Sequence, residues 1–173
     1  MHYRICKILL VASVGLFLFI VVLNNTVLDY NSNYKFVEGV LSMDTLFSGE
    51  SQAWRAFRNP DPGQGYWLYH TFYASLILWE AAAAALCFAG VVKLTKNLSA
   101  PAPIFNAAKQ LAVYGLTLSL LQWFVAFITV GGEWFLMWQS SKWNGQEAAF
   151  RMFACLGIIL LFLSFKDEEL TEK

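Results

Sequence analysis

Charged residues are scarce in this chain. Lys, Arg, Asp and Glu make up only 14% of its 173 residues, whereas hydrophobic residues make up 58% and aromatic residues 17%. An ordinary soluble domain carries about 25% charged residues, so this composition excludes that class and predicts an integral membrane protein. The formal net charge is zero, so no basic field favours nucleic acid as a partner.

Cysteine and histidine are also few. Cys6, Cys87 and Cys155 include no C-x-x-C pair, and none lies in the long polar loop, which argues against a disulfide framework, a zinc site or a thiol oxidase. We expect them to be small buried hydrophobic residues. His2 and His70 cannot supply a pair of transmembrane haem ligands, and we interpret His70 as a lone interfacial histidine.

The motifs of the common hydrolases are missing as well. The chain has no G-x-S-x-G turn and no H-E-x-x-H helix, and its serines have no neighbouring base in sequence. We therefore predict no catalytic residues, no metal and no cofactor, and expect a protein that is not an enzyme.

Long apolar runs dominate what remains. Each is close to the roughly 20 residues that a helix needs to cross the hydrocarbon core. The runs cover residues 8–28, 66–92, 104–130 and 148–165. They predict an all-α membrane protein, a four-transmembrane-helix bundle that forms a single domain over residues 1–173. A cleaved signal peptide is the alternative for the first run, but the following VVLNNTVLDY contains no small-x-small cleavage pattern.

Basic residues in the short connections predict the orientation. The linker between the second and third runs carries three lysines and no acid, and the amino terminus adds two more basic residues. These residues are Lys93, Lys96, Lys109, Arg4 and Lys7. The positive-inside rule then places both termini in the cytoplasm. The tail at 166–173 is expected to be a plain, solvated acidic end.

Residues 29–65 and 131–147 are predicted to form an extracytoplasmic cap. The first of these loops is too long for a simple connection. From Asn33, an acceptable N-cap, NYKFVEGVLSMDTLF has apolar residues near helical spacing, and ESQAWRAF can form a second short helix. We expect a cap of short amphipathic helices, although the sequence leaves open whether the first loop pairs into a small sheet.

Aromatic and polar residues alternate in both parts of this cap. Aromatic belts normally anchor a protein at the membrane interface, but the polar residues between them exceed what anchoring requires. We predict an outer interaction surface formed by Trp54, Arg55, Glu133, Trp134, Trp138, Trp143 and Asn144.

Three stretches carry a resemblance to a known family. They are NTVLDYNSNYKFVEGVLSMDTLF, the alanine-rich second run and GGEWFLMWQSSKWNGQEAAFR. Together they resemble the bacterial family of predicted small integral membrane proteins of unknown function. The resemblance covers nearly the whole chain and implies a four-span, multi-pass protein of the bacterial inner membrane. It implies no catalytic residues. The loop layout is also similar to the claudin class, but the paired loop cysteines and the W-G-L-W pattern of that class are missing.

Glu80 is the one acidic residue within the second run, LILWEAAAAAL. At about 1.5 Å per residue it lies about 21 Å along the helix, near the middle of a core roughly 30 Å thick. A carboxyl group there must be protonated, paired or in contact with a wet cavity. Gln122, Arg151 and His70 are the conceivable partners, and we predict a buried polar cluster of Glu80, Gln122 and Arg151. The alanines after Glu80 predict close helix packing.

Two functions follow from these features. The first is an accessory or assembly partner of a larger envelope complex, with a membrane protein or a second copy of the chain bound at the outer surface. The alternative is a protein that binds a lipid, a quinone or a proton-coupled solute, a small apolar ligand, through Glu80. Glu80 can equally be structural, holding helices together through hydrogen bonds. The lipid bilayer is the environment in both cases.

Overall fold

The described chain is helical. The computed structural model describes residues 1–61 and 64–170, with residues 50, 51 and 53 as backbone only. Within these residues it contains no strand longer than a single bridge pair. The all-α prediction is therefore confirmed. The loop and tail predictions at residues 62–63 and 171–173 lie outside the described residues.

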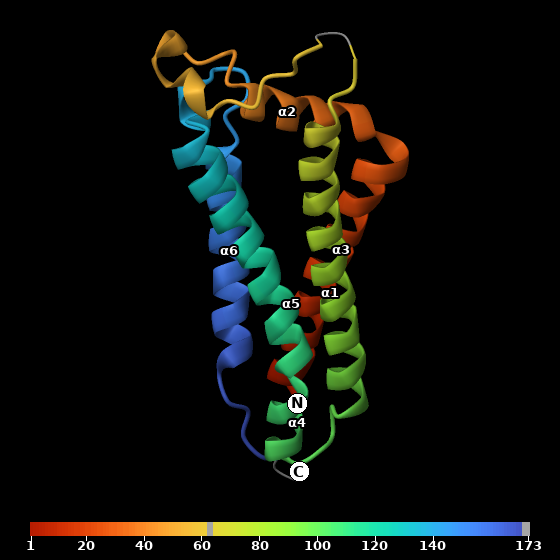
Figure 1. The fold of residues 1–173 in the computed structure, drawn as a ribbon. Coiled ribbons are helices and arrows are strands. Elements are labelled where there is room, and N and C mark those ends of the chain that lie inside the picture. Colours follow the sequence, from red (N-terminus) through yellow and green to blue (C-terminus); the bar gives the residue numbers. More distant parts are fainter. Residues whose placement is uncertain (62–63, 171–173) are drawn as a thin grey trace. The chain divides into compact units, whose positions relative to one another are not determined.

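Ten helical elements follow one another along the described part of the chain (Figure 1). The α-helices are α1 (His2–Leu23), α2 (Tyr30–Ser42), α3 (Trp67–Lys96), α4 (Ala102–Ala108), α5 (Gln110–Leu121) and α6 (Gln146–Ser164). Two π-helical elements, η1 (Asn24–Leu28) and η3 (Gln122–Trp134), extend α1 and α5, and two 3₁₀ helices are η2 (Gly49–Arg55) and η4 (Met137–Gln139).

Four helical stretches of the described chain are long and apolar enough to cross a membrane. They are His2–Leu28, Trp67–Lys96, Ala102–Trp134 and Gln146–Ser164. These stretches coincide with the four predicted runs, and each is longer than predicted. The first begins six residues earlier because Arg4 and Lys7, which look like polar flanks in the sequence, are helical and buried.

The chain divides into two compact units. Unit 1 comprises Met1–Val22, Trp79–Leu120 and the chain from Ala154 on, and unit 2 comprises Leu23–Leu78 and Leu121–Phe153. Each unit contains segments that are distant in the sequence, and α3 contributes its first turns to unit 2 and the rest to unit 1.

In unit 1, α3 and α5 pack backbone against backbone. A Cβ atom added to Gly115 would lie 2.7 Å from both the backbone nitrogen and the Sγ of Cys87, and one added to Gly90 would lie 2.6 Å from the nitrogen of Ala112. Ala83 is completely buried beside this contact. The close packing expected from the alanine run is therefore present, since small residues let helix backbones approach each other in lipid.

The cysteines only partly follow the prediction. Cys87 is buried in the α3–α5 contact, but Cys6 and Cys155 are exposed on α1 and α6. The expectation that all three are buried is wrong, because apolar helices in a membrane can also turn small apolar residues toward the lipid.

In unit 2, α2 runs crosswise to the first turns of α3 (Figure 1). Its N-cap is Asp29, whose Oδ1 accepts a hydrogen bond from the nitrogen of Ser32 at 3.3 Å. The prediction of Asn33 as N-cap is therefore wrong by one turn. The Asn33 side chain instead donates to Asn25 Oδ1 at 2.7 Å, which ties α2 to η1.

The predicted amphipathic helix buries its apolar side in a small core. Leu41, Met43, Tyr69 and Phe135 form this core, with the loop and helix residues of the cap packed around it. The Tyr69 hydroxyl donates to the carbonyl of Phe57 at 2.5 Å, so α3 also fixes the loop that follows η2.

The two parts of the cap meet within unit 2. Leu46 and Ser140 form an isolated antiparallel bridge, and the nitrogen of Phe47 donates to the carbonyl of Gln139 at 3.1 Å. The Thr45 and Ser140 hydroxyls lie 2.7 Å apart. The first loop is thus helical with one bridge pair, and the short helix predicted around ESQAWRAF corresponds to η2.

Candidate functional site

Arg55 organises the exposed aromatic side chains of the cap. Its guanidinium carbon lies 5.2 Å from the ring centre of Trp54 and 5.6 Å from that of Trp134. Its Nη1 donates to the carbonyls of Glu133 and Trp134, both at 3.3 Å. The two indole rings meet edge to face at 6.1 Å. η2 and the end of η3 are thereby held together.

The aromatic rings around Arg55 remain accessible. Trp54 is 71% exposed, and Trp134, Phe47 and Trp138 are also exposed. Phe47 and Trp138 form a second edge-to-face pair, with their ring centres 6.2 Å apart. We call Phe47, Trp54, Arg55, Trp134 and Trp138 the cap aromatic surface.

Trp143 and Asn144, which were also predicted for this surface, make contacts within unit 2. The Trp143 ring packs against the backbone of α2 at Gly39 and meets Phe36 edge to face at 6.0 Å. Asn144 Oδ1 accepts a hydrogen bond from the nitrogen of Gln146 at 3.1 Å, at the start of α6. Both contacts stabilise the fold of unit 2.

His70 belongs to an aromatic stack at the start of α3. Its Nδ1 lies 2.8 Å from the Tyr30 hydroxyl, and its ring stacks on Tyr34 with centres 4.3 Å apart. Tyr73 meets Tyr30 edge to face at 4.8 Å and donates to the carbonyl of Asn25. Burial raises the pKa of the Tyr30 and Tyr34 hydroxyls above the ordinary tyrosine value. The arrangement fastens α2 to α3.

Glu80 is buried in unit 1, with only 6% of its surface exposed. The neighbouring Trp79 donates from Nε1 to the carbonyl of Leu118 at 2.9 Å, which adds a polar contact to the α3–α5 packing. In unit 2, the buried Gln122 side chain donates to the carbonyl of Leu76 at 3.5 Å, at the first residue of η3. The side chains of Glu80 and Gln122 are thus both on apolar helices and shielded from solvent.

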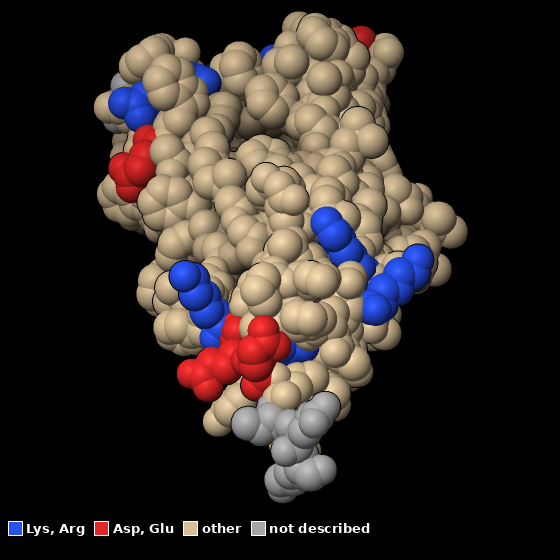
Figure 2. Space-filling view, turned by 90° about the horizontal axis from the view of Figure 1, so that it is seen from below, with Lys and Arg blue, Asp and Glu red and all other residues tan. Residues whose placement is uncertain are grey.

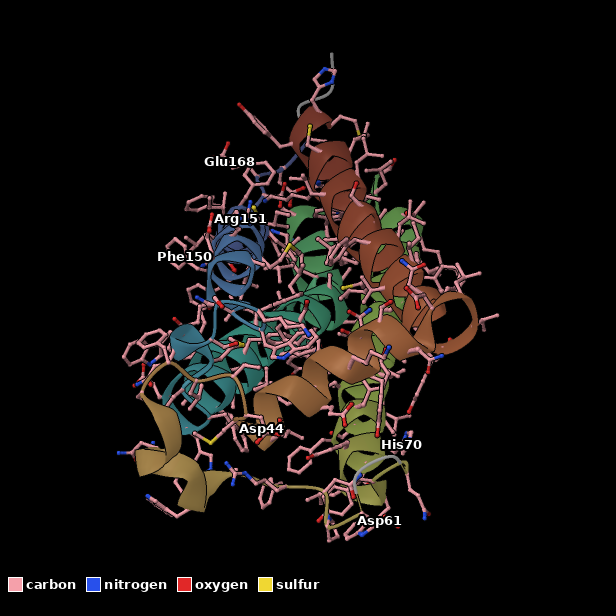
Figure 3. All side chains as sticks on the ribbon, turned by 90° about the horizontal axis from the view of Figure 1, so that it is seen from above. Asp44, Asp61, His70, Phe150, Arg151 and Glu168 are labelled. Atoms are coloured by element: carbon pink, nitrogen blue, oxygen red, sulfur yellow. The ribbon has the colours of Figure 1, made fainter. Side chains whose placement is uncertain are left out.

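Arg151 is not buried. Its side chain is 69% exposed and lies 3.8 Å from Glu147, one turn earlier on α6. Figure 3 shows Arg151 on the outer side of α6, next to Phe150. The expectation that Arg151 belongs to a buried polar cluster is therefore wrong, because α6 turns this position outward.

A cluster of buried charges lies at the end of unit 1, where the amino terminus meets the tail. The Lys7 ammonium lies 2.7 Å from Asp167 Oδ2 and also donates to the carbonyl of Phe165. Lys109 pairs with the same carboxylate oxygen. Asn106 donates to the carbonyl of Asp167 and accepts from its nitrogen. Lys7 from α1 and Lys109 from the turn between α4 and α5 thus hold one carboxylate.

Arg4 completes this cluster. Its two terminal nitrogens donate to the carbonyls of Leu98, Ala100 and Glu168 at 2.7 to 3.1 Å. The guanidinium also lies 4.5 Å from the ring centre of Phe105. Arg4 therefore joins the start of α1, the α3–α4 connection and the tail. We call Arg4, Lys7, Lys109 and Asp167 the buried charge cluster.

The cluster determines the ionisation of Asp167. Burial by itself raises the pKa of this carboxyl group, but hydrogen bonds and charge from Lys109 and Lys7 outweigh burial and hold the pKa below its ordinary value. Asp167 therefore stays ionised under ordinary conditions.

The sequence analysis did not predict the buried charge cluster. It used the basic residues of this cluster only to predict the orientation of the chain in the membrane. The tail was expected to be a plain solvated end, and this is wrong for its first part, because Asp167 is buried and Glu169 accepts a hydrogen bond from the nitrogen of Ala102 at 3.0 Å. Figure 2 shows the acidic side chains of this end gathered beside basic ones. The one available signal was the unusual position of Arg4 and Lys7, immediately before an apolar run without a compensating acid.

No metal site is formed by the described residues, since no three His, Cys, Asp or Glu side chains among them lie close enough together. The chain does match one protein family. Residues 3–166 match the family described as "Predicted small integral membrane protein (DUF2165)". No curated protein and no solved structure matches the chain.

Proposed function

This chain belongs to the family of predicted small integral membrane proteins, and from that premise we propose that it is a non-enzymatic accessory or assembly partner of a larger envelope complex. It uses the cap aromatic surface to bind another membrane protein. The described part of the chain has four helices long and apolar enough to span a membrane, and the family description names no activity.

The observation that supports this proposal is the arrangement of Trp54, Arg55 and Trp134. Two exposed indole rings are held in place by one guanidinium, which is itself fixed by two backbone carbonyls. Trp and Arg dominate the energetic centres of protein interfaces, particularly where their side chains are preorganised. Simple anchoring in the interface does not require a guanidinium in contact with both rings.

Site-specific photocrosslinking in the native membrane tests this proposal. A photoreactive phenylalanine analogue replaces Trp54 or Trp138, and the matched control replaces Leu161, which is exposed on α6 in unit 1. We expect both cap positions to capture the same protein and the control position to capture lipid only. Crosslinks to lipid alone from all three positions contradict the proposal, and crosslinks to a second copy identify a homo-oligomer instead.

We further propose that the protein lies in the bacterial inner membrane with both termini in the cytoplasm. Contacts of Arg4 with Ala100 and Glu168 support this, because they gather the start of the chain, the α3–α4 connection and the tail at one end of unit 1. The lysines at this end agree with the positive-inside rule. Single cysteines placed at Lys96 and Gly49 test it: a membrane-impermeant maleimide added from outside should label position 49 only, in a background without native cysteines.

The burial of Glu80 supports a second candidate function, the binding of a small apolar ligand or a proton-coupled solute. An acidic residue inside a membrane helix is a functional candidate by default. Glu80→Gln keeps hydrogen-bonding capacity and removes the ionisable group. If a normally folded Glu80→Gln protein no longer binds the ligand or the proton-coupled solute, the result supports this candidate function. If binding is unchanged, Glu80 has a structural role.

A further inference from the structure

We propose that unit 1 binds the phosphate group of an anionic phospholipid at the buried charge cluster. Beside this cluster lies a cavity of about 780 Å³. Its wall includes Arg4, Lys7, Phe162, Phe165, Lys166 and Asp167. All of these residues belong to unit 1.

The buried charges of this end do not balance. Arg4, Lys7 and Lys109 are each at most 5% exposed, and Asp167 is the one carboxylate buried among them. Two positive charges are therefore in excess in a layer where desolvation is costly. Glu168 and Glu169 are exposed, so water and salt screen their carboxylates more strongly. An anion in the cavity would balance the excess.

Lys7 lines the cavity and retains a donor for such an anion. Lys7 donates to Phe165 and Asp167, and an ammonium group has three donors. The three carbonyls that hold the Arg4 guanidinium also fix its position before any ligand arrives. A phosphate oxygen accepts charge-assisted hydrogen bonds from guanidinium and ammonium groups of this kind.

The position of the cavity along the helices favours a lipid over a free anion. α6 ends at Ser164 and α1 begins at His2, so the cavity lies where apolar spans end. Phe162 and Phe165 line the cavity together with Lys7 and Lys166. Headgroup phosphates lie at this level of a bilayer, with acyl chains toward the apolar side. Basic pockets between membrane helices bind anionic headgroups in the same way.

Two of the three acidic residues that line the cavity already have partners for their carboxylates. The Asp167 carboxylate is already paired with Lys7 and Lys109, and Glu169 accepts a hydrogen bond from the nitrogen of Ala102. Lys166, which is exposed and lines the cavity, adds a further cation.

Native mass spectrometry of the purified full-length protein tests the proposal. The probes are dioleoyl phosphatidylglycerol and dioleoyl phosphatidylcholine, each added to the protein in detergent. We expect phosphatidylglycerol to be retained more tightly. Lys166→Gln should weaken its binding about fivefold, the order expected for the loss of one lysine beside an anionic headgroup. Lys96→Gln is the matched control, since Lys96 is exposed at the end of α3 and does not line the cavity.

Three results would overturn the proposal. Equal retention of the two lipids would remove the requirement for a negative charge. An equal loss of binding in Lys166→Gln and Lys96→Gln would show general surface attraction. Displacement of phosphatidylglycerol by an equal concentration of inorganic phosphate would identify a site for free anions.

A second variant pair examines the buried lysine directly. Lys7→Arg keeps the positive charge and should retain the preference for phosphatidylglycerol, whereas Lys7→Gln should lose it. If either Lys7 variant fails to fold, the comparison of Lys166→Gln with Lys96→Gln still tests the proposal. Retention of the full preference in a folded Lys7→Gln protein contradicts the proposal.

Discussion

The Lys7 ammonium and the Asp167 carboxylate lie 2.7 Å apart, although 160 residues separate them in the sequence. Both side chains are almost completely buried, and Lys109 shares the same carboxylate oxygen. This contact joins the first helix of unit 1 to the segment that follows its last helix. The tail is therefore part of the fold of unit 1 at least as far as this residue.

The lowered pKa of Asp167 predicts loss of stability in acid. Because its folded-state pKa lies below the unfolded value of 3.8, the stabilisation is fully present above the unfolded pKa. It is lost as the pH falls below about 4 and through the folded pKa. Thermal unfolding of the detergent-solubilised protein between pH 7 and pH 3 should show this loss.

Asp167→Asn should remove this stabilisation at neutral pH as well. Removing one partner of a buried ion pair costs about 3 kcal/mol or more, because the remaining lysines lose their counter-charge. Glu168→Gln is the control, since the side chain of Glu168 is exposed. An Asp167→Asn protein that unfolds in acid with the wild-type pH dependence would show that another carboxyl group is responsible.

Gly115→Ala should separate α3 from α5. The added methyl group would meet the backbone nitrogen of Cys87 at 2.7 Å, and this atom cannot move without displacing α3. Overpacking of this kind costs about 1 to 3 kcal/mol, measurable as a lower midpoint of unfolding in detergent.

Gly157→Ala provides the matched control for that change. Gly157 is also a helical glycine of unit 1, but an added methyl group would have only Leu120 nearby, at 3.8 Å. Its substitution should be neutral or slightly stabilising, because alanine is the better helix former. Equal destabilisation by both substitutions would mean that the α3–α5 contact is looser than described.

The four spans could be predicted because their signal is local. A run of about 20 apolar residues has few alternatives to a membrane helix, wherever it lies in the chain. Helix ends were less predictable. Arg4 and Lys7 are buried within α1 because carbonyls and Asp167 satisfy them, and no pattern near the amino terminus contains those partners.

The residues of the candidate sites also differ in how well the sequence predicts them. The sequence pointed to Trp54, Arg55 and Trp134 because aromatic and polar residues alternate in both cap loops. It missed the role of Asp167, since KDEELTEK has the composition of a solvated tail and its partners lie elsewhere in the chain. It also misplaced Arg151, because which side of α6 faces the protein depends on packing that the sequence does not express.

Tyr30→Phe should weaken the attachment of α2 to α3. The substitution keeps the ring that stacks on Tyr34 and meets Tyr73 edge to face, but it removes the hydroxyl that lies 2.8 Å from His70 Nδ1. Loss of such a hydrogen bond costs about 1 kcal/mol. Hydrogen exchange of α2 amides should become faster. Tyr3→Phe is the control, since Tyr3 is exposed in unit 1, and it should leave exchange in α2 unchanged; an unchanged rate in Tyr30→Phe would assign the attachment to ring packing alone.

Arg55→Lys should reduce partner capture by the cap aromatic surface. Lysine keeps the charge but lacks the planar fork that contacts both indole rings and donates to the carbonyls of Glu133 and Trp134. Disrupting an interface centre of this kind costs about 2 kcal/mol or more of binding free energy, which corresponds to a loss of roughly 30-fold in affinity. The amount of partner crosslinked from position 138 should therefore fall with this loss of affinity.

Arg58→Lys is the control for this last change. Arg58 pairs with Asp44 at 3.2 Å in the same unit, but both side chains are about half exposed, and an exposed ion pair tolerates lysine at little cost. Capture from position 138 should then stay at the wild-type level. If Arg55→Lys captures as much partner as Arg58→Lys, the contact of the guanidinium with both rings is not needed, and Trp54 and Trp134 act as ordinary interfacial anchors.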